Sequence, residues 1–168
     1  MDLPFTMPFT RNSLVSIDRE GNFYTAWAED FLIKVYDKEG NYKQSFYYPS
    51  EKPSLLLDEL EINSERQRVL NRYELPETWP ALHTMELDDE GRLWVATITE
   101  SDSTFQWYVL GNDGEILARF QLAGKREYRS VMSDPLIRVH NGYFYSREVI
   151  HQEGIDRVIK YKIHFKQR

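Results

Sequence analysis

The sequence predicts an all-β fold of consecutive four-stranded antiparallel β-sheets, about three in number, arranged as the blades of a partial β-propeller. Two observations predict it. A glycine-containing polar turn followed by an aromatic strand occurs three times, at 18–24, 88–94 and 140–145. The composition also favours strands, since 14% of the residues are aromatic. A β-sandwich is the alternative fold, but it does not require the same unit three times.

The repeated turns have a chemistry that favours hairpins. Asp18-Arg19-Glu20-Gly21 and Asp88-Asp89-Glu90-Gly91 each end in glycine, which adopts positive φ without a Cβ clash. The aspartate at the start of each turn can accept hydrogen bonds from the backbone amides that follow it. Further turns at 37–40 and 112–114 close a second hairpin in the first two units. Both units are therefore expected to be complete four-stranded meanders.

The strands follow from these turns and from the alternation of apolar and polar residues. The predicted strands are 14–17, 22–27, 31–36 and 42–48 in the first blade, 81–87, 92–99, 105–110 and 116–122 in the second, and 136–139, 143–151 and 157–165 in the third. A single domain over 1–168 is expected, with blades at 13–48, 80–122 and 135–166. The third blade has three strands, and the apolar stretch at 3–9 could supply its fourth.

One segment interrupts the β pattern, and we expect it to be a helical insertion between the first two blades. The insertion occupies 52–76, with helix at about 54–75. Ser54 is a suitable N-cap after Pro53, and Pro76 ends the segment. An apolar stripe with helical spacing runs along it. The stripe comprises Leu56, Leu60, Val69, Leu70 and Tyr73.

Charge and composition exclude several classes of function. The formal net charge of −6 argues against a nucleic-acid partner and against binding to anionic membranes. No run of apolar residues approaches the roughly 20 needed for a membrane span. The N-terminus has no signal-peptide pattern, so we expect a soluble chain of undetermined compartment, which a longer precursor could export. Cysteine is absent, which excludes disulfides and thiol nucleophiles.

Five residues are candidates for ligand binding. His83 lies on the innermost strand of the second blade, where it could face the channel, and Trp79 could edge a pocket at the entry to that blade. Arg126, Tyr128 and Arg129 form a polar loop before the third blade. Each candidate also has a purely structural explanation. His83 could be a hydrogen-bonded structural histidine, Trp79 a core residue, and the segment with the other three a solvated loop. No catalytic residue, metal-ligand spacing or phosphate-binding motif occurs, so no cofactor is expected.

The segment from Glu86 to Val95, the run Val35-Tyr36-Asp37-Lys38-Glu39-Gly40-Asn41 and the insertion before Trp79 resemble the NHL-like six-bladed β-propeller proteins of bacteria. The resemblance implies a ring of six blades, of which this chain would supply half and leave two blade faces bare. Three explanations are compatible with that: two chains closing one ring, a fragment that lacks its other blades, or a smaller open β structure.

The expected function is a non-enzymatic binding or scaffold module, whose loops and channel mouth meet a protein, peptide or carbohydrate partner. Two alternatives stand beside it. Six-bladed propellers also host calcium-dependent lactonases and lyases, in which case calcium would be the cofactor. The chain could also be a truncated fragment with no independent function. The innermost predicted strands are mainly apolar, which favours binding over metal-dependent catalysis.

Overall fold

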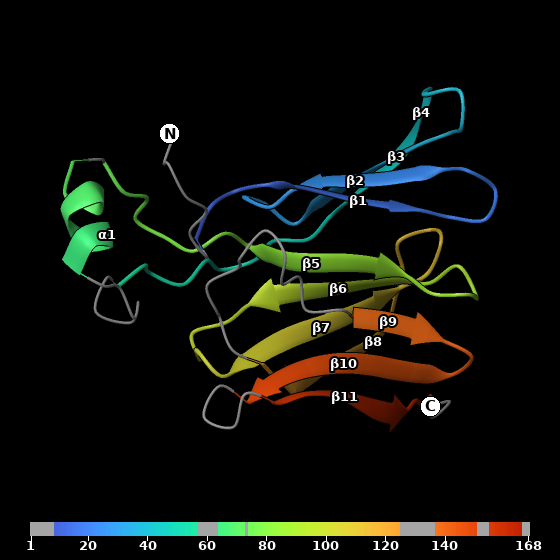
Figure 1. Cartoon of the computed structure of the whole chain (residues 1–168). Coiled ribbons are helices and arrows are strands. Elements are labelled where there is room, and N and C mark those ends of the chain that lie inside the picture. Colours follow the sequence, from blue (N-terminus) through green and yellow to red (C-terminus); the bar gives the residue numbers. More distant parts are fainter. Residues whose placement is uncertain (1–8, 57–63, 73, 125–136, 151–154, 166–168) are drawn as a thin grey trace.

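The computed structural model describes residues 9–56, 64–72, 74–124, 137–150 and 155–165. They form three antiparallel sheets that stack one on the next (Figure 1). The first sheet contains β1 (Ser13–Ile17), β2 (Phe23–Trp27), β3 (Leu32–Tyr36) and β4 (Tyr42–Tyr47). The second contains β5 (Leu82–Leu87), β6 (Leu93–Ile98), β7 (Thr104–Leu110) and β8 (Ile116–Ala123). The third contains β9 (Ile137–His140), β10 (Tyr143–Ile150) and β11 (Ile155–Lys162).

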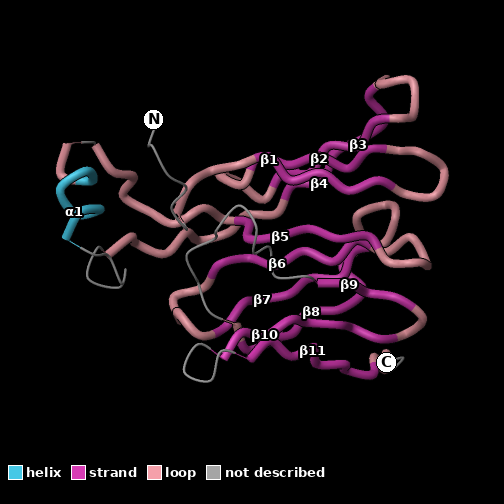
Figure 2. The backbone as a smooth tube through the Cα atoms, in the orientation of Figure 1, coloured by secondary structure: helices cyan, strands magenta, loops and turns pink. Residues whose placement is uncertain are grey.

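Each sheet is a meander in which neighbouring strands are also consecutive in the sequence (Figure 2). The polar turns form as their composition predicts. In the turn after β1, Oδ1 of Asp18 accepts hydrogen bonds from the amides of Glu20 and Asn22, at 2.9 and 2.8 Å. Gly21 has a φ of 86°, the conformation that its missing side chain allows. The all-β class and the four-stranded antiparallel sheets are therefore confirmed.

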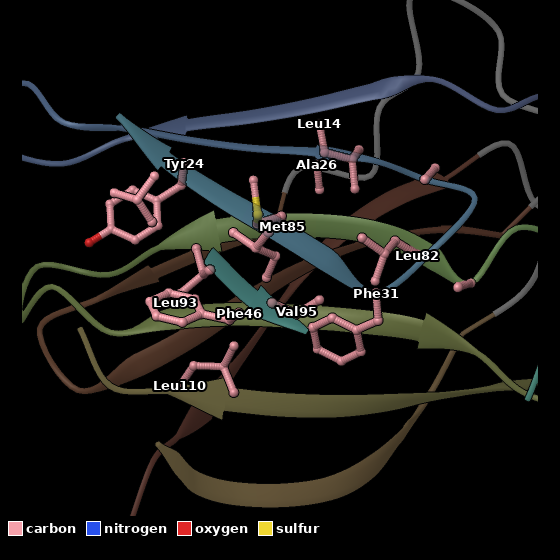
Figure 3. Close-up of a cluster of buried hydrophobic side chains, with 14 residues drawn as sticks. Leu14, Tyr24, Ala26, Phe31, Phe46, Leu82, Met85, Leu93, Val95 and Leu110 are labelled. Atoms are coloured by element: carbon pink, nitrogen blue, oxygen red, sulfur yellow. The ribbon is translucent and has the colours of Figure 1, made fainter. Parts of the chain in front are cut away.

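The first and second sheets pack face to face through a cluster of buried apolar side chains (Figure 3). The first sheet contributes Leu14, Tyr24, Ala26, Ile33, Val35 and Phe46, and the second contributes Leu82, Met85, Leu93, Val95 and Leu110. The buried carbon surface is the main source of stability at such an interface. Phe31, just before β3, joins the cluster and meets Tyr108 of β7 edge to face, with 5.3 Å between ring centroids.

The opposite face of the second sheet packs on the third sheet through a separate, aromatic cluster. Phe144 of β10 meets Trp107 of β7 edge to face, with 5.1 Å between ring centroids. Val139 of β9 is buried in the same cluster. Because the second sheet is covered on both faces, every residue of its central strand β6 is buried. The second sheet is therefore the middle layer of the stack.

The innermost strands β1, β5 and β9 lie side by side, as they do around the axis of a propeller. The backbone amide of Leu87 donates a 3.1 Å hydrogen bond to the hydroxyl of Ser16, which joins the ends of β5 and β1. The described residues form an open stack of three sheets and no closed ring. The structure therefore shows stacked antiparallel meanders, and closure into a propeller ring is not part of it.

The predicted helical insertion over 54–75 is not seen. Within the described part of that segment, helix is confined to α1 (Ser64–Leu70), which lies to one side of the stack, beyond the ends of the strands (Figure 1). Ser54 forms an isolated antiparallel bridge with Thr78 instead of capping a helix. The amide of Leu55 donates to the carbonyl of Glu77, at 2.9 Å, so the two arms of the segment pair with each other. Extended backbone replaces helix because these amides find partners across the connection.

Two further features bear on the boundaries of the fold. The predicted strand at 3–9 lies outside the described residues except for Phe9, which is buried in the aromatic cluster. Arg11 donates to the carbonyls of Phe9 and Thr78, at 3.1 and 2.9 Å, and so ties this segment to the connection that enters β5. Among the described residues, no helix has the length and apolar character needed to span a membrane.

Candidate binding site at the channel mouth

An open depression of about 510 Å³ lies where the three innermost strands end. Its lining comes from the ends of β1, β5 and β9 and from β10: residues 17–19, 86–89, 138–140 and Tyr145. All three sheets therefore contribute to it, and its shape depends on how they are docked. In a propeller this position is the mouth of the central channel, where ligands commonly bind. We refer to it below as the mouth.

The lining of the mouth combines apolar and charged side chains. Val139 is buried and Leu87 half-buried, while Ile17 leaves 56% of its surface exposed. Around them lie carboxylates from β5 and its turn, and the cationic groups of Arg19 and Arg138. An apolar surface bordered by groups of both charges suits a ligand that itself carries polar groups of both kinds.

Ion pairs across the mouth join the second sheet to the third. Arg138 of β9 forms an ion pair with Glu86 of β5. Oδ1 and Oδ2 of Asp89 each accept from the amide of Asn141, at 3.1 Å, and Nδ1 of His140 lies 3.7 Å from Oδ2 of the same aspartate. Arg138 keeps 70% of its side chain exposed, so the Glu86 pair is open to exchange with a ligand.

Asp89 is held in its charged form. Burial raises the pKa of Asp89, but the hydrogen bond from the Asn141 amide and the nearby His140 and Arg19 outweigh that effect and lower the pKa overall. Asp18, in the equivalent turn after β1, behaves similarly. Burial raises the pKa of Asp18, and hydrogen bonds from the Asn22 side chain and the turn amides bring it below its ordinary value. Both carboxylates therefore stay ionised near neutral pH.

Asp88 lies at the mouth but is fully used by the protein. Its Oδ1 accepts from the amides of Glu90 and Arg92, both at 2.9 Å. Its Oδ2 accepts from Nε of Arg92 at 2.6 Å and from Nε1 of Trp94 at 2.8 Å. The side chain has no exposed surface. Asp88 is thus a structural residue that fixes the turn, and the exposed charges around it are the groups that a ligand would meet.

The arrangement offers little for metal chemistry. In the described ranges, no group of three or more His, Asp or Glu side chains is placed to hold a metal ion. The calcium-dependent alternative therefore gains no support from the mouth as the structure describes it. What the site provides is hydrogen-bonding and ion-pairing groups around an apolar patch, which is the chemistry of recognition.

Of the five sequence-predicted site residues, the structure describes His83 and Trp79, and both lie away from the mouth. His83 lies at the irregularity between Leu82 and Thr84 and stacks on Phe105, with 4.1 Å between ring centroids and 14° between planes. Trp79 is 1% exposed, and its backbone amide donates to the carbonyl of Pro53 at 2.8 Å. Trp79 belongs to the aromatic cluster, His83 stacks on Phe105 of that cluster, and neither residue lines the mouth. Arg126, Tyr128 and Arg129 lie outside the described residues.

The residues that do line the mouth were missed because each looks like ordinary turn or strand chemistry. A signal was present nonetheless. The innermost strand of every blade runs in the same direction, so the residues directly after it should converge. Asp18 and Asp88 occupy that position after β1 and β5, and His140 is the last residue of β9. Reading the repeats against one another at this point would have identified the mouth.

No protein-family model matches this sequence, and no curated protein matches it significantly. The similarity to NHL-like propellers thus rests on the turn and strand motifs alone. The class that the structure itself defines is an all-β protein of stacked antiparallel meanders.

Proposed function

We propose that this chain is a non-enzymatic binding module that recognises a polypeptide segment at the mouth. The observation that carries the proposal is the lining itself: the three sheets bring Arg19, Arg138, Glu86 and Asp89 around the exposed side chain of Ile17 and the half-buried Leu87. Peptides present charged groups of both signs beside apolar side chains, which matches this combination. The proposal supplies a ligand class for the channel mouth that the sequence predicts as the binding surface.

The electrostatics support a reversible interaction. Arg138 is largely exposed, so a ligand carboxylate can replace Glu86 as its partner without removing the guanidinium from water. Asp89 is ionised and partly covered, and it can receive a ligand cation beside His140. Exposed ion pairs are weakened by salt, so binding at the mouth should become weaker as ionic strength rises.

A peptide-display screen tests this function. Immobilised protein is used to select from a library of random peptides, and selected peptides are then measured by calorimetry against the wild type and Arg138→Ala. We expect about tenfold weaker binding to the variant, equivalent to about 1.4 kcal/mol. Lys38→Ala is the matched control, because Lys38 is an exposed cation in the turn after β3, away from the mouth.

The outcomes separate clearly. Selection of peptides that bind wild type and Lys38→Ala equally, and Arg138→Ala less tightly, supports the proposal. Peptides that bind all three proteins alike bind somewhere other than the mouth and would overturn it. A screen that yields no peptide, together with glycan-array binding that Arg138→Ala abolishes, would replace the polypeptide by a carbohydrate at the same site.

A further inference from the structure

The first sheet leaves one of its two faces uncovered, and that face is mainly apolar, with a polar row of Thr25, Lys34 and Ser45 across its middle. Opposite the face that packs on the second sheet lie Val15, Ile17, Trp27, Tyr42 and Tyr47, which are between 55% and 65% exposed. Phe23, Leu32 and Tyr36 are half-buried on the same face. We call this set of eight side chains the open face. Contiguous apolar surface of this kind marks interaction sites in soluble proteins.

The open face repeats a surface that is already an interface within this chain. Aligning the turn at Asp18 with the turn at Asp88 places Val15 at Met85 and Phe23 at Leu93. Met85 and Leu93 are 6% and 1% exposed, because the first sheet covers them. In the second sheet this face is covered by a neighbouring sheet, whereas the equivalent face of the first sheet is exposed. The open face is therefore the side of a sheet that this chain buries elsewhere.

The other end of the stack has a different character. The uncovered face of the third sheet, opposite Val139 and Phe144, carries Arg138, Lys160 and Lys162 beside two tyrosines. Nζ of Lys160 lies 3.7 Å from the ring centroid of Tyr143 and 5.6 Å from that of Tyr145. A polar outer face is how terminal units of stacked repeats remain exposed to water. This end of the stack therefore behaves as a cap.

This asymmetry decides which face of a second copy suits the open face. Of the two uncovered faces among the described sheets, the open face is the mainly apolar one. A second copy of the chain presents the same apolar face. The cationic face of another copy is a poor partner. None of β1, β2, β3 and β4 contains Asp or Glu, so Arg138, Lys160 and Lys162 would meet Lys34 without a carboxylate. Two open faces, in contrast, bring together only the two copies of Lys34.

We propose that two copies of this chain associate by packing their open faces against each other around a two-fold axis. Such an interface is isologous, as most dimer interfaces are. The tyrosine hydroxyls and the Lys34 amine provide its hydrogen-bonding groups. Four strands spaced about 4.8 Å apart, with a rise of about 3.3 Å per residue, give a footprint of about 300 Å². An interface of this size is small, so the dimer should dissociate on dilution.

Paired charge variants test the proposal by sedimentation velocity over micromolar to submillimolar concentrations. One variant carries Val15→Lys and Tyr47→Lys, and the other carries Val15→Glu and Tyr47→Glu. Each variant alone should be monomeric throughout that range, with dimerisation weakened at least about a hundredfold by like-charge repulsion. An equimolar mixture should recover a dimer. The matched control is Val158→Lys, a similarly exposed strand residue (69%) in the third sheet, and it should leave dimerisation unchanged.

The design separates this dimer from a two-chain ring, in which the open face would meet the cationic face of a partner. In a ring, the glutamate variant alone would associate more tightly than the wild type, and Val158→Lys would weaken association. Either result overturns face-to-face pairing. A wild-type protein that stays monomeric at every concentration also overturns it. Circular dichroism of each variant verifies that the sheets are intact.

Discussion

The indole Nε1 of Trp94 donates a 2.8 Å hydrogen bond to Oδ2 of Asp88, the residue that opens the turn before it. One carboxylate therefore holds the backbone of the turn and also orients an indole ring at the interface between the second and third sheets. The equivalent residue of the first sheet, Asp18, fixes its own turn in the same way but has Tyr24 in place of the tryptophan.

Replacing Asp88 with alanine should destabilise the protein by about 3 kcal/mol, because one buried and three part-buried donors lose their acceptor together. Urea unfolding followed by circular dichroism measures the loss. Asp37→Ala is the matched control: Asp37 accepts the same pair of turn amides, from Glu39 and Asn41, but lies in water. A smaller effect is expected there, and equal losses at the two positions would contradict this account of Asp88.

Gly114 should not tolerate a side chain. Its φ is +87°, and a Cβ placed on it would lie 2.3 Å from Cδ1 of Phe46, within the contact between the first two sheets. Gly114→Ala must therefore strain the turn and also displace the phenyl ring. Gly40→Ala has the same conformational cost of about 1 kcal/mol, since its φ is +86°, but no atom lies within 4 Å of the added methyl group. Thermal unfolding should show a clearly lower melting temperature for Gly114→Ala than for Gly40→Ala.

Glu29 should make stability depend on pH in the acid range. Hydrogen bonds from Arg11 and then Lys52 lower the pKa of Glu29 in the folded protein. A lowered pKa adds stability above the unfolded value near 4.5, and that contribution is lost as the pH falls through the folded pKa. Glu29→Gln should therefore cost about 1–2 kcal/mol at neutral pH and progressively less in acid.

The measurement for Glu29 is urea unfolding of wild type and variant across that pH range. The same ion pair raises the pKa of Lys52, so its contribution persists at neutral pH and declines only as the pH rises through the raised pKa. A difference between Glu29→Gln and the wild type that stays constant from neutral pH into acid would contradict the ion-pair account.

Phe144 should be required for docking of the third sheet. Its ring contacts Trp107 and Trp94, with centroid distances of 5.1 and 6.0 Å. Phe144→Ala should cost about 3–4 kcal/mol through the cavity it leaves. Water entering beside the two indoles should shift tryptophan fluorescence to longer wavelength. Tyr143→Ala, which removes the neighbouring ring on the exposed side of β10, should leave the emission wavelength unchanged.

The strands were predictable because turn chemistry and alternation are local. The predicted strand 92–99 is observed at Leu93–Ile98, and 31–36 at Leu32–Tyr36. The helix prediction over 54–75 was wrong because the apolar stripe of that segment has helical spacing, whereas the pairing of Ser54 with Thr78 is non-local and leaves no periodic trace. Local pattern thus identified the meanders but not the connection between them.

The candidate site was less predictable for a related reason. Arg138 and Glu86 meet although 52 residues separate them, and they do so only after the third sheet docks on the second. Trp79 was predicted to edge a pocket, because the sequence around a tryptophan does not show how deeply its side chain is buried. In the structure this side chain is almost completely buried. Its burial depends on Phe9 and Leu70, which reach the same cluster from distant parts of the chain.

The connectivity of the meanders has a consequence for how this protein acquires its structure. Each strand bonds to the strand next to it in the sequence, so each sheet requires the closure of short loops alone. Sheet docking, in contrast, needs partners far apart along the chain. We expect hairpins to form early and the second sheet to be the surface on which the other two condense, with the amides of β6 the slowest in the described chain to exchange with solvent deuterium.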